Sequence, residues 1–432
     1  MGVGFVILGS SILALLLAGY LAQYLLPPPV PKILGIDLGT TYSCIGMYHA
    51  VSGRVDILSV QNEQQCIPSV VAFNESGVFV GYDAVAQAEY NPKNTIYDSK
   101  RFIGRHFTPE ELADIQKHYP FQMSLRNGKH PVFHINVNNN LTYKTPEEIS
   151  SILLQTLVAA ADRNLSVAVK KVVISVPAEF DEMQRNYTRK SANLLGLQVM
   201  RIINEPTAAA MAYGFHSAPS LCYIIVVDLG GGTLDVSLLN VQGGMFLTLA
   251  MAGNNRLGGQ DFNQRLTDHM LDLISKQFNK QLVDKTDRQT LRFQVEEAKL
   301  KLTDRLSTDI SMKITSFQGS PTFHTTVTRQ HFENLNADLF KKVLDPIDSV
   351  LKTVLMDRQE VHDVVLVGGS TRIPKVQNLI KEYFNKDPNT SVEPELAVAI
   401  GVSIQAGILG GMWPLTVSAV EKPIQTKKIH IS

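Results

Sequence analysis

The chain has 432 residues, of which 44% are hydrophobic and 19% are charged. This composition supplies enough apolar material for a large globular body with two or more lobes, and it excludes a disordered or fibrous chain. Forty Lys and Arg residues balance forty Asp and Glu residues, so no net field favours nucleic acid or an anionic membrane surface, and an anionic ligand has to be bound by local groups.

An apolar segment opens the chain, from Val3 to Leu26, and the first charged residue is Lys32. Its length suffices to cross a bilayer as a helix. The basic residues that normally open a signal peptide are missing and the cleavage site is vague, so a cleaved signal and a retained anchor both stay open. Prolines at 27–29 and 31 then separate this segment from the rest of the chain, and we expect membrane association only through residues 1–31.

The cysteines Cys44, Cys66 and Cys222 lie far apart without a CxxC spacing. This pattern argues against a zinc site and against a disulfide scaffold, so we expect buried free thiols. Five N-x-S/T sequons permit glycosylation if the chain reaches a glycosylating compartment, and they begin at Asn74, Asn140, Asn164, Asn186 and Asn389.

Strand-like and helix-like segments alternate after the prolines, which predicts an α/β fold. Thr145-Pro146-Glu147-Glu148 forms a capping box that opens a helix. Further expected elements are a strand at 171–176, a helix at 181–195 closed by Gly196, a strand at 199–203 and a helix at 206–213 closed by Gly214. From residue 223 onward, strands alternate with glycine turns, including a hairpin turn at 241–244 before a strand at 245–251, so we expect two hairpin-bearing sheets.

One short motif occurs twice, as IDLGTT from Ile36 and as VDLGGGT from Val227, each after an apolar strand. Such a repeat predicts two related halves. Glycines allow the backbone to approach a phosphate chain, and the hydroxyls of Thr40, Thr41 and Thr233 can donate to phosphate oxygens. Asp37 and Asp228 would repel phosphate unless a hard cation lies between them, most simply hydrated magnesium. A single copy is more often an ordinary hairpin turn, but two copies favour a phosphate site.

A third glycine turn follows a buried strand at 364–367 and precedes a helix that begins near Pro374. A strand, a glycine turn and a helix start suit a nucleotide. We expect the turn, Gly368-Gly369-Ser370-Thr371-Arg372, to lie against an adenine ring with Arg372 stacked on its face.

Seven motifs follow one another along the chain: IDLGTTYS from Ile36, DSKRFIGR from Asp98, VPAEF from Val176, INEPTAAAMAYG from Ile203, DLGGGTLDVS from Asp228, LGGQDFN from Leu257 and LVGGSTRIPK from Leu366. In order and spacing they resemble the nucleotide domain of the heat-shock-70 (stress-70) chaperones, from about residue 32 to about residue 409. The short form with an apolar leader is similar to the microsomal branch of that family.

The resemblance implies an actin-like ATPase fold of duplicated, ribonuclease H-like domains, with lobes at 32–213 and 214–409 around a central nucleotide cleft and a short tail at 410–432. It implies that Lys100 orients the attacking water, although a solvated basic pair with Arg101 is the simpler interpretation from the residues alone. It assigns catalysis to Lys100, Glu205, Asp228, Thr233 and Asp37, magnesium through water to Asp37 and Asp228, and phosphate binding to Gly39, Thr40, Thr41, Tyr42, Gly230, Gly231, Gly232 and Thr233.

Glu296, Lys299 and Thr303 share one helical face, for which a salt-bridged solvent face is the ordinary explanation. The resemblance assigns this face to the adenosine, and it makes Pro177 a switch proline and Arg201 a relay between the lobes. Thr303, Gln260 and Glu395 replace a serine, an acidic residue and an aspartate of the family pattern. The complete implied adenosine set is Gly259, Glu296, Lys299, Thr303, Gly368, Gly369, Ser370, Arg372 and Glu395.

The family's peptide-binding domain cannot fit after residue 409, where Trp413-Pro414-Leu415 retains at most a fragment of linker or first strand. Two functions stay open: a slow ATPase that uses ATP, magnesium and, as a further candidate, K⁺, and a nucleotide-gated interaction module with incidental turnover. A sugar kinase on the same fold lacks matching motifs. We expect a monomer in the endoplasmic reticulum lumen or microsome, with co-chaperones or exchange factors as partners and no nucleic acid.

Overall fold

The computed structural model describes residues 31–49, 52–412, 419–424 and 426–431, with isolated positions 12, 14, 15 and 17. The predicted apolar leader, apart from those four positions, and the predicted linker fragment at 413–415 lie outside the described residues. Within the described part of the chain, no helix combines the length and apolarity that a bilayer crossing requires.

The first lobe is built on a mixed sheet, ordered β12-β11-β1-β2-β3, with β4 paired to β2. β1 and β2 form the hairpin that carries the first motif, and β11 runs parallel to β1. The strands predicted at 171–176 and 199–203 are confirmed as β11 and β12. The bounds are β1 Leu34–Leu38, β2 Tyr42–His49, β3 Arg54–Ile57, β4 Cys66–Pro68, β11 Lys171–Val176 and β12 Gln198–Asn204.

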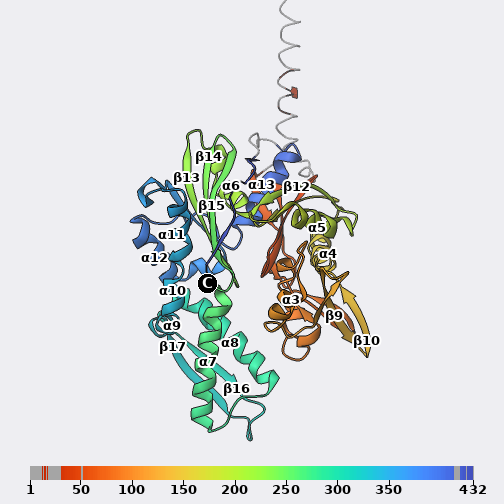
Figure 1. Ribbon diagram of the computed structural model, residues 1–432, viewed down its shortest axis with the longest axis vertical. Helices are drawn as coiled ribbons and strands as arrows, with labels where there is room; N and C mark the ends of the chain where they lie inside the picture. The colour runs from red at the N-terminus through yellow and green to blue at the C-terminus, as the bar shows by residue number, and fades with distance from the viewer. Residues whose placement is uncertain are drawn as a thin grey trace, which may run out of the picture.

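Helices and two small sheets complete this lobe, on the right of Figure 1. The predicted capping box opens α4, where Thr145 accepts from the Glu148 amide and Glu148 from the Thr145 amide. The bounds are β5 Val71–Asn74, β6 Gly77–Val80, α2 Tyr82–Val85, η1 Pro92–Asn94, β7 Thr95–Ile96, η2 Ser99–Arg101, α3 Pro109–Gln116, β8 Met123–Arg126, β9 His130–Val137, β10 Asn140–Lys144, α4 Pro146–Leu165 and α5 Glu182–Asn193.

The second lobe repeats the arrangement at the centre of the first. β13 and β14 form the hairpin of the second motif, β15 continues the meander, and β18 runs parallel to β13 as β11 does to β1. This shared strand order gives the sequence repeat a structural counterpart. The bounds are β13 Cys222–Leu229, β14 Leu234–Gln242, β15 Met245–Asn254, β18 Asp363–Val367, β19 Val420–Glu421 and β20 Ile429–His430.

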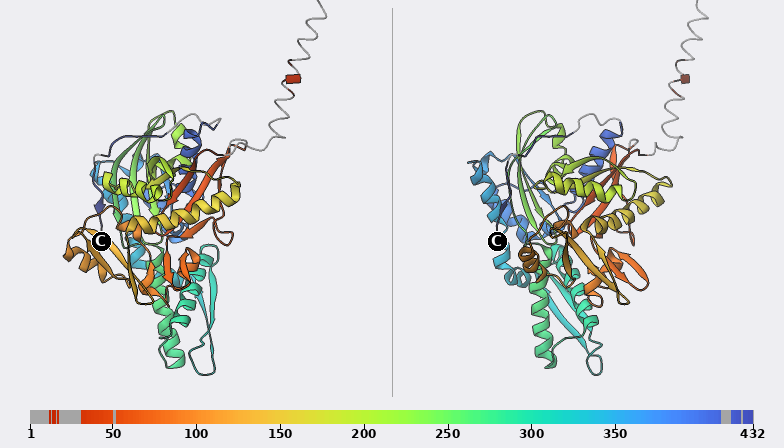
Figure 2. Two further views of the ribbon diagram at one scale, coloured as in Figure 1. Left: turned by 90° about the vertical axis from the view of Figure 1, so that its right-hand side faces the viewer. Right: turned by 45° about the vertical axis from the view of Figure 1, so that its right-hand side comes forward.

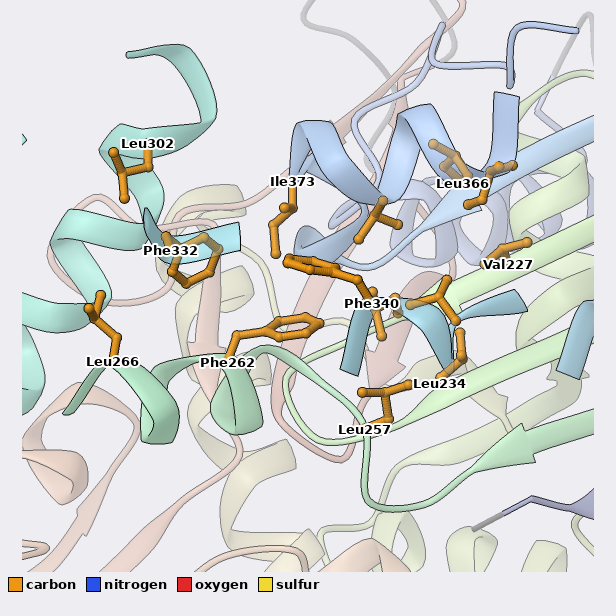
Figure 3. Close-up of a cluster of buried hydrophobic side chains, with 14 of the residues drawn as sticks. Val227, Leu234, Leu257, Phe262, Leu266, Leu302, Phe332, Phe340, Leu366 and Ile373 are labelled. Carbon is orange, nitrogen blue, oxygen red and sulfur yellow. The ribbon is translucent and has the colours of Figure 1, made fainter. Parts of the chain in front are cut away.

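Long helices and a further hairpin extend the second lobe away from its sheet, toward the bottom of Figure 1 and in both views of Figure 2. Apolar side chains from these helices meet the sheet in one core, in which the Phe262 and Phe340 rings stack with centroids 4.9 Å apart (Figure 3). The bounds are η3 Phe215–Ser217, α7 Gly259–Phe278, α8 Lys285–Asp304, β16 Ser307–Lys313, β17 Thr322–Thr328, α9 Arg329–Leu335, α10 Ala337–Lys341, α11 Leu344–Thr353, η4 Arg358–Glu360, η5 Gly369–Arg372 and α12 Pro374–Phe384.

Two helices of small residues lie between the sheets: α6 (Glu205–Ala212) and α13 (Ala397–Leu409). α13 ends the predicted second lobe, yet it packs on β1, β2 and β11 of the first sheet as well as on α6. A Cβ atom at Gly401 would overlap the carbonyl oxygen of Ala208, so the two helices touch backbone to backbone. The boundary at 213/214 stays a prediction, and α13, although it follows the second sheet in the chain, packs on elements of the first lobe.

The expectation of three free thiols is wrong for two of them. Cys44 on β2 and Cys66 on β4 stand opposite each other in the antiparallel register, with Cα atoms 4.4 Å apart, and form a disulfide. Cys222 is free. The 22-residue separation hides this pairing in the sequence, because only the sheet register brings the two strands side by side.

Candidate functional site

The first predicted phosphate loop is the turn between β1 and β2. Gly39 leaves no room for a side chain, since a Cβ there would overlap the carbonyl oxygen of Tyr42. Ser69, which sequence reasoning missed, fixes the turn from outside: its hydroxyl donates to the Gly39 carbonyl at 2.8 Å and its amide donates to the Thr41 carbonyl at 2.8 Å. The loop is therefore held in shape before any ligand arrives.

The second loop, between β13 and β14, is closed by a bond from the Gly230 amide to the Thr233 carbonyl at 3.0 Å. The start of α7 locks against it, because the Gly259 amide donates to the Gly230 carbonyl at 3.0 Å. The two loops meet: a Cβ at Gly231 would lie 2.5 Å from a methyl carbon of Thr41. The structure thus brings together the two glycine turns that the sequence separates.

Lys100 stands beside the first loop and is only 7% exposed. Its ammonium donates to the Leu38 carbonyl at 2.5 Å and to Glu205 Oε1 at 2.5 Å. The interpretation of Lys100 as half of a solvated basic pair is therefore wrong. Asp37 lies beside it and accepts a 2.7 Å bond from the Ser175 hydroxyl, a partner that no sequence pattern indicated because β11 delivers it from 138 positions away.

The carboxylates of this cluster have raised pKa values. Burial raises the pKa of Asp37 and of Glu205, and the nearby Lys100 ammonium opposes that shift in both. Burial also raises the pKa of Asp228 well above 3.8, with further contributions from Glu205, Asp235 and Asp37. Mutual repulsion in a buried space marks a place where an additional cation would be stabilised.

The donor set fits hydrated magnesium better than a directly coordinated metal. Asp37 and Asp228 are the next-to-last residues of the equivalent strands β1 and β13. Among the described residues, no group of three His, Cys, Asp or Glu residues could hold a metal ion directly. Magnesium retains several waters and commonly binds through one or two carboxylates and substrate phosphates. Asp37 and Asp228 suit this role.

A basic side chain also crosses between the lobes. Arg101, next to Lys100, donates to the carbonyl oxygens of Gly232 at 3.4 Å and Asn255 at 3.3 Å, while Asp98 accepts from its Nε at 3.0 Å. The sequence presented Arg101 only as a neighbour of Lys100. Its side chain joins the first lobe to the second glycine loop.

The predicted nucleoside face on α8 is partly buried and not a solvent face. Lys299 is 8% exposed and donates to Glu296 at 2.9 Å, and Asn263 on α7 donates to the same carboxylate. Burial, and next the charge of Glu296, raise the pKa of Tyr42, which follows the first loop. The Thr303 hydroxyl donates to the Leu300 carbonyl of its own helix at 2.6 Å, and its role toward the adenosine stays a prediction.

The third glycine turn meets the second of the two glycine loops. Gly368 has a φ of +82°, and the Ser370 hydroxyl donates to the Gly230 carbonyl at 2.9 Å. A Cβ at Gly259 would lie 2.7 Å from the Ser370 hydroxyl. Gly259 and the third glycine turn, which are both predicted to contact the adenosine, therefore lie next to each other. Arg372 pairs with Glu395 at 2.9 Å, which holds its guanidinium in place beside the turn; Gly369 has open space around it.

Two residues singled out by resemblance take different positions. Pro177 lines a small pocket together with Glu205, Asp228, Glu179, Asp235 and Lys428. Arg201 lies on β12, opposite Val173 of β11. Lys428 carried no motif signal, and Asp235 lay within the DLGGGTLDVS motif without an assigned role; the strands place both near Asp228.

Comparisons with known proteins agree with this geometry. The family model described as Hsp70 protein matches residues 33–421. The chain is 48% identical over 458 residues to heat shock 70 kDa protein 13 of Mus musculus and of Homo sapiens, and each alignment covers 96% of this chain and 97% of the relative. The heat shock 70 kDa protein of Neurospora crassa is 42% identical over 381 residues, which cover 88% of this chain and 58% of that protein.

Proposed function

Because the chain belongs to the Hsp70 family, whose ATPase domain has the actin-like fold, we propose that it binds magnesium-ATP between its two lobes and hydrolyses it slowly to ADP and phosphate. Family membership supports a nucleotide-binding ATPase of the chaperone type. The proposal adds that this chain itself turns ATP over, without coupling to a peptide-binding domain.

The observation that carries the proposal is the position of Lys100. A buried ammonium that bonds both the Leu38 carbonyl and Glu205, beside the first glycine loop, is placed to orient a water and to balance charge on a transferring phosphoryl group. The water oxygen attacks the γ-phosphorus, the bond to the ADP oxygen breaks, and Glu205, whose pKa burial raises, is suited to accept the water's proton. The hydroxyls of Thr40, Thr41 and Thr233 adjoin the phosphate oxygens.

Magnesium, when bound, neutralises charge on the β- and γ-phosphate oxygens. Asp37 and Asp228 would hold its water shell, and Ser175 keeps Asp37 oriented. A K⁺ ion is a further candidate for the same acidic cluster. Glu296, Lys299, Ser370 and Arg372 would receive the adenosine from two sides.

A second candidate function is a nucleotide-gated interaction module with negligible turnover. The contacts of Arg101 with Gly232 and Asn255 favour it, because they cross between the lobes at the phosphate loop and so couple nucleotide binding to lobe closure. Co-chaperones or nucleotide exchange factors would recognise the closed form. We expect the protein to act as a monomer.

A location in the secretory pathway is part of the proposal. The Cys44–Cys66 disulfide supports it, since disulfides persist in oxidising compartments and are rare in the cytosol. The apolar leader, as a cleaved signal or a retained anchor, would supply the route to the endoplasmic reticulum lumen.

Single-turnover hydrolysis of labelled ATP by the full chain tests the proposed activity. Lys100→Ala should slow the chemical step by about 10²–10³-fold, the usual loss for one preorganised charge-stabilising group, while ATP is still bound. Thr233→Ala should slow it in the same direction. The matched control is Lys93→Ala, which removes an exposed lysine close by and should leave the rate unchanged.

If the wild-type protein binds ATP tightly but is as inactive as Lys100→Ala, the protein is an interaction module. If it binds no adenine nucleotide with magnesium present, both candidate functions fail.

A further inference from the structure

The chain near its C-terminus runs along the outer edge of β15 in the second sheet. β19 and β20 both pair with β15 in parallel, with Val420 opposite Met245 and Ile429 opposite Ala252. Backbone bonds fasten both ends, from the Val420 amide to Gly244 at 2.7 Å and from the Ile431 amide to Gly253 at 2.8 Å. We call residues 419–431 the edge segment, of which all but residue 425 are described.

The edge segment also reaches the first lobe. The Asn204 amide, one residue before Glu205, donates to Glu421 Oε1 at 2.9 Å. Lys428 makes a second crossing, because its ammonium lies 3.1 Å from Glu179 Oε1 in the first lobe and 2.5 Å from Asp235 Oδ1 in the second. One side chain therefore ties the two lobes together.

Lys428 is an unusual surface-segment lysine, since its side chain is only 6% exposed. Burial alone would lower its pKa, but Asp235 and Glu179 together raise it, so the ammonium stays charged at neutral pH. A cation is rarely buried to this extent unless it is paired. Asn255 Oδ1 accepts a further bond from it at 3.3 Å.

The charge that Lys428 balances lies next to the catalytic carboxylates. Asp235 stands opposite Asp228 in the β13–β14 register, and its negative charge contributes to the raised pKa of both Asp228 and Glu205. Asp235, Asp228, Glu205 and Lys428 line the same pocket. An ammonium beside Asp235 reduces the repulsion that a phosphate chain and the two catalytic carboxylates would otherwise experience.

We propose that Lys428 is a positioning residue for magnesium-nucleotide binding and hydrolysis: the edge segment carries its ammonium to Asp235 and Glu179, where it neutralises the outer carboxylates of the cleft and holds the lobes together behind Asp228 and Glu205. This inference rests on the proposed function and deepens it. An edge segment that only covered β15 would need the backbone bonds but not the ammonium group.

The test compares full-chain Lys428→Met, Lys428→Arg and Lys428→Ala with wild type. Lys427→Met is the matched control, because it removes the same charge from the neighbouring lysine, which is exposed. Calorimetry with magnesium-ATP and magnesium-ADP and single-turnover hydrolysis are measured for each, with thermal unfolding to confirm folding. Lys428→Met should weaken nucleotide affinity or slow hydrolysis by about tenfold or more, Lys428→Arg should restore most of the loss, and Lys427→Met should match wild type.

Chemical rescue separates positioning from mere packing. Millimolar methylammonium should recover part of the hydrolysis or affinity lost in Lys428→Ala and should leave wild type unchanged, because the small cation can occupy the site of the missing ammonium. The proposal is overturned if Lys428→Met binds and hydrolyses like wild type, or if its loss follows a lowered Tm and responds to neither Arg nor methylammonium. Wild type without hydrolysis refutes the proposed ATPase, and the nucleotide affinities then still decide the role of Lys428.

Discussion

Some buried carboxyl groups of the candidate site are unfavourable in their ionised form, and a bound cation can reduce this cost. Burial and neighbouring carboxylates raise the pKa of Asp228 well above its ordinary 3.8. A carboxyl group whose pKa is higher in the folded than in the unfolded chain stabilises the fold below the unfolded pKa, and this contribution is lost as the pH rises through the folded pKa. At neutral pH, Asp228 therefore lowers the free energy of unfolding of the nucleotide-free protein relative to its value at low pH.

Asp228→Asn should accordingly raise the free energy of unfolding of the nucleotide-free protein at pH 7, by about 1–3 kcal/mol, the scale of one uncompensated buried polar group. The gain should shrink as the pH falls toward the ordinary carboxyl pKa, and magnesium-ATP should stabilise wild type more than the variant. Thermal and urea unfolding across pH measure this, with the exposed Asp56→Asn as control. A variant less stable than wild type at pH 7 contradicts the assignment.

The sequence motifs predicted many residues of the candidate site but not the residues that hold them in place. Lys100, Glu205, Asp37 and Asp228 were named from motifs, and the structure gathers them with both glycine loops. Ser69, Ser175 and Lys428 were missed because their partners are distant in the chain and a lone serine or lysine has no motif. The disulfide was misjudged for the same reason: spacing says nothing about a register between β2 and β4.

Helices and turns were predicted well where the hydrophobic periodicity agreed with the positions of the glycines that end them. Glycines in the left-handed region follow both predicted helices, at Gly196 with φ +70° and at Gly214 with φ +85°. The turn before β15 uses Gly243 and Gly244, both at positive φ, as the hairpin pattern indicated. β19 and β20 could not be predicted, since each is a two-residue strand that exists only because the β15 edge offers it hydrogen bonds.

The close contact between α6 and α13 predicts that a larger side chain at Gly401 destabilises the protein. In an isolated helix Gly401→Ala would gain about 1 kcal/mol from propensity, but here the new Cβ would overlap the Ala208 carbonyl oxygen. The steric overlap should outweigh the gain in helix propensity, so Gly401→Ala should lower the free energy of unfolding by about 1–3 kcal/mol. Gly369→Ala, with open space around it, is the control in the same urea-unfolding series; equal stability of Gly401→Ala and wild type would show that the helices can separate freely.

At the scale of the whole molecule, the fold class predicted from the motifs is confirmed: two sheets of shared topology carry the two motifs, and the Hsp70 model covers residues 33–421. The exact lobe boundary could not come from the sequence, because α13 follows the second sheet in the chain but packs on the first. Chain order and spatial order differ at that point.

The proposed location in the secretory pathway can be tested through the glycans and the disulfide of the folded protein. Asn140 begins β10 and is exposed, whereas Asn74, Asn164, Asn186 and Asn389 all take part in side-chain hydrogen bonds. If the chain enters the endoplasmic reticulum, Asn140 is the sequon we expect to carry a glycan. Peptide mapping after expression in a secretory cell should find sugar at Asn140 and a linked Cys44–Cys66 pair; Asn140→Gln should remove the corresponding mass, and an unmodified protein with reduced cysteines would argue against this location.

The chain leaves the first sheet through β12 and α6, comes back to it as α13 and then reaches the second sheet again as β19, so the connections between the lobes pass the packed helices α6 and α13. Connections gathered at one pair of helices permit rotation of the lobes about that pair and resist sliding of one lobe past the other. The lobes should therefore open by rotation about α6 and α13. A rotation of a few degrees would barely move Glu205, which begins α6, while it would carry the far ends of α7 and α8 through a wide arc, so that the proposed adenosine site would open before the proposed phosphate site.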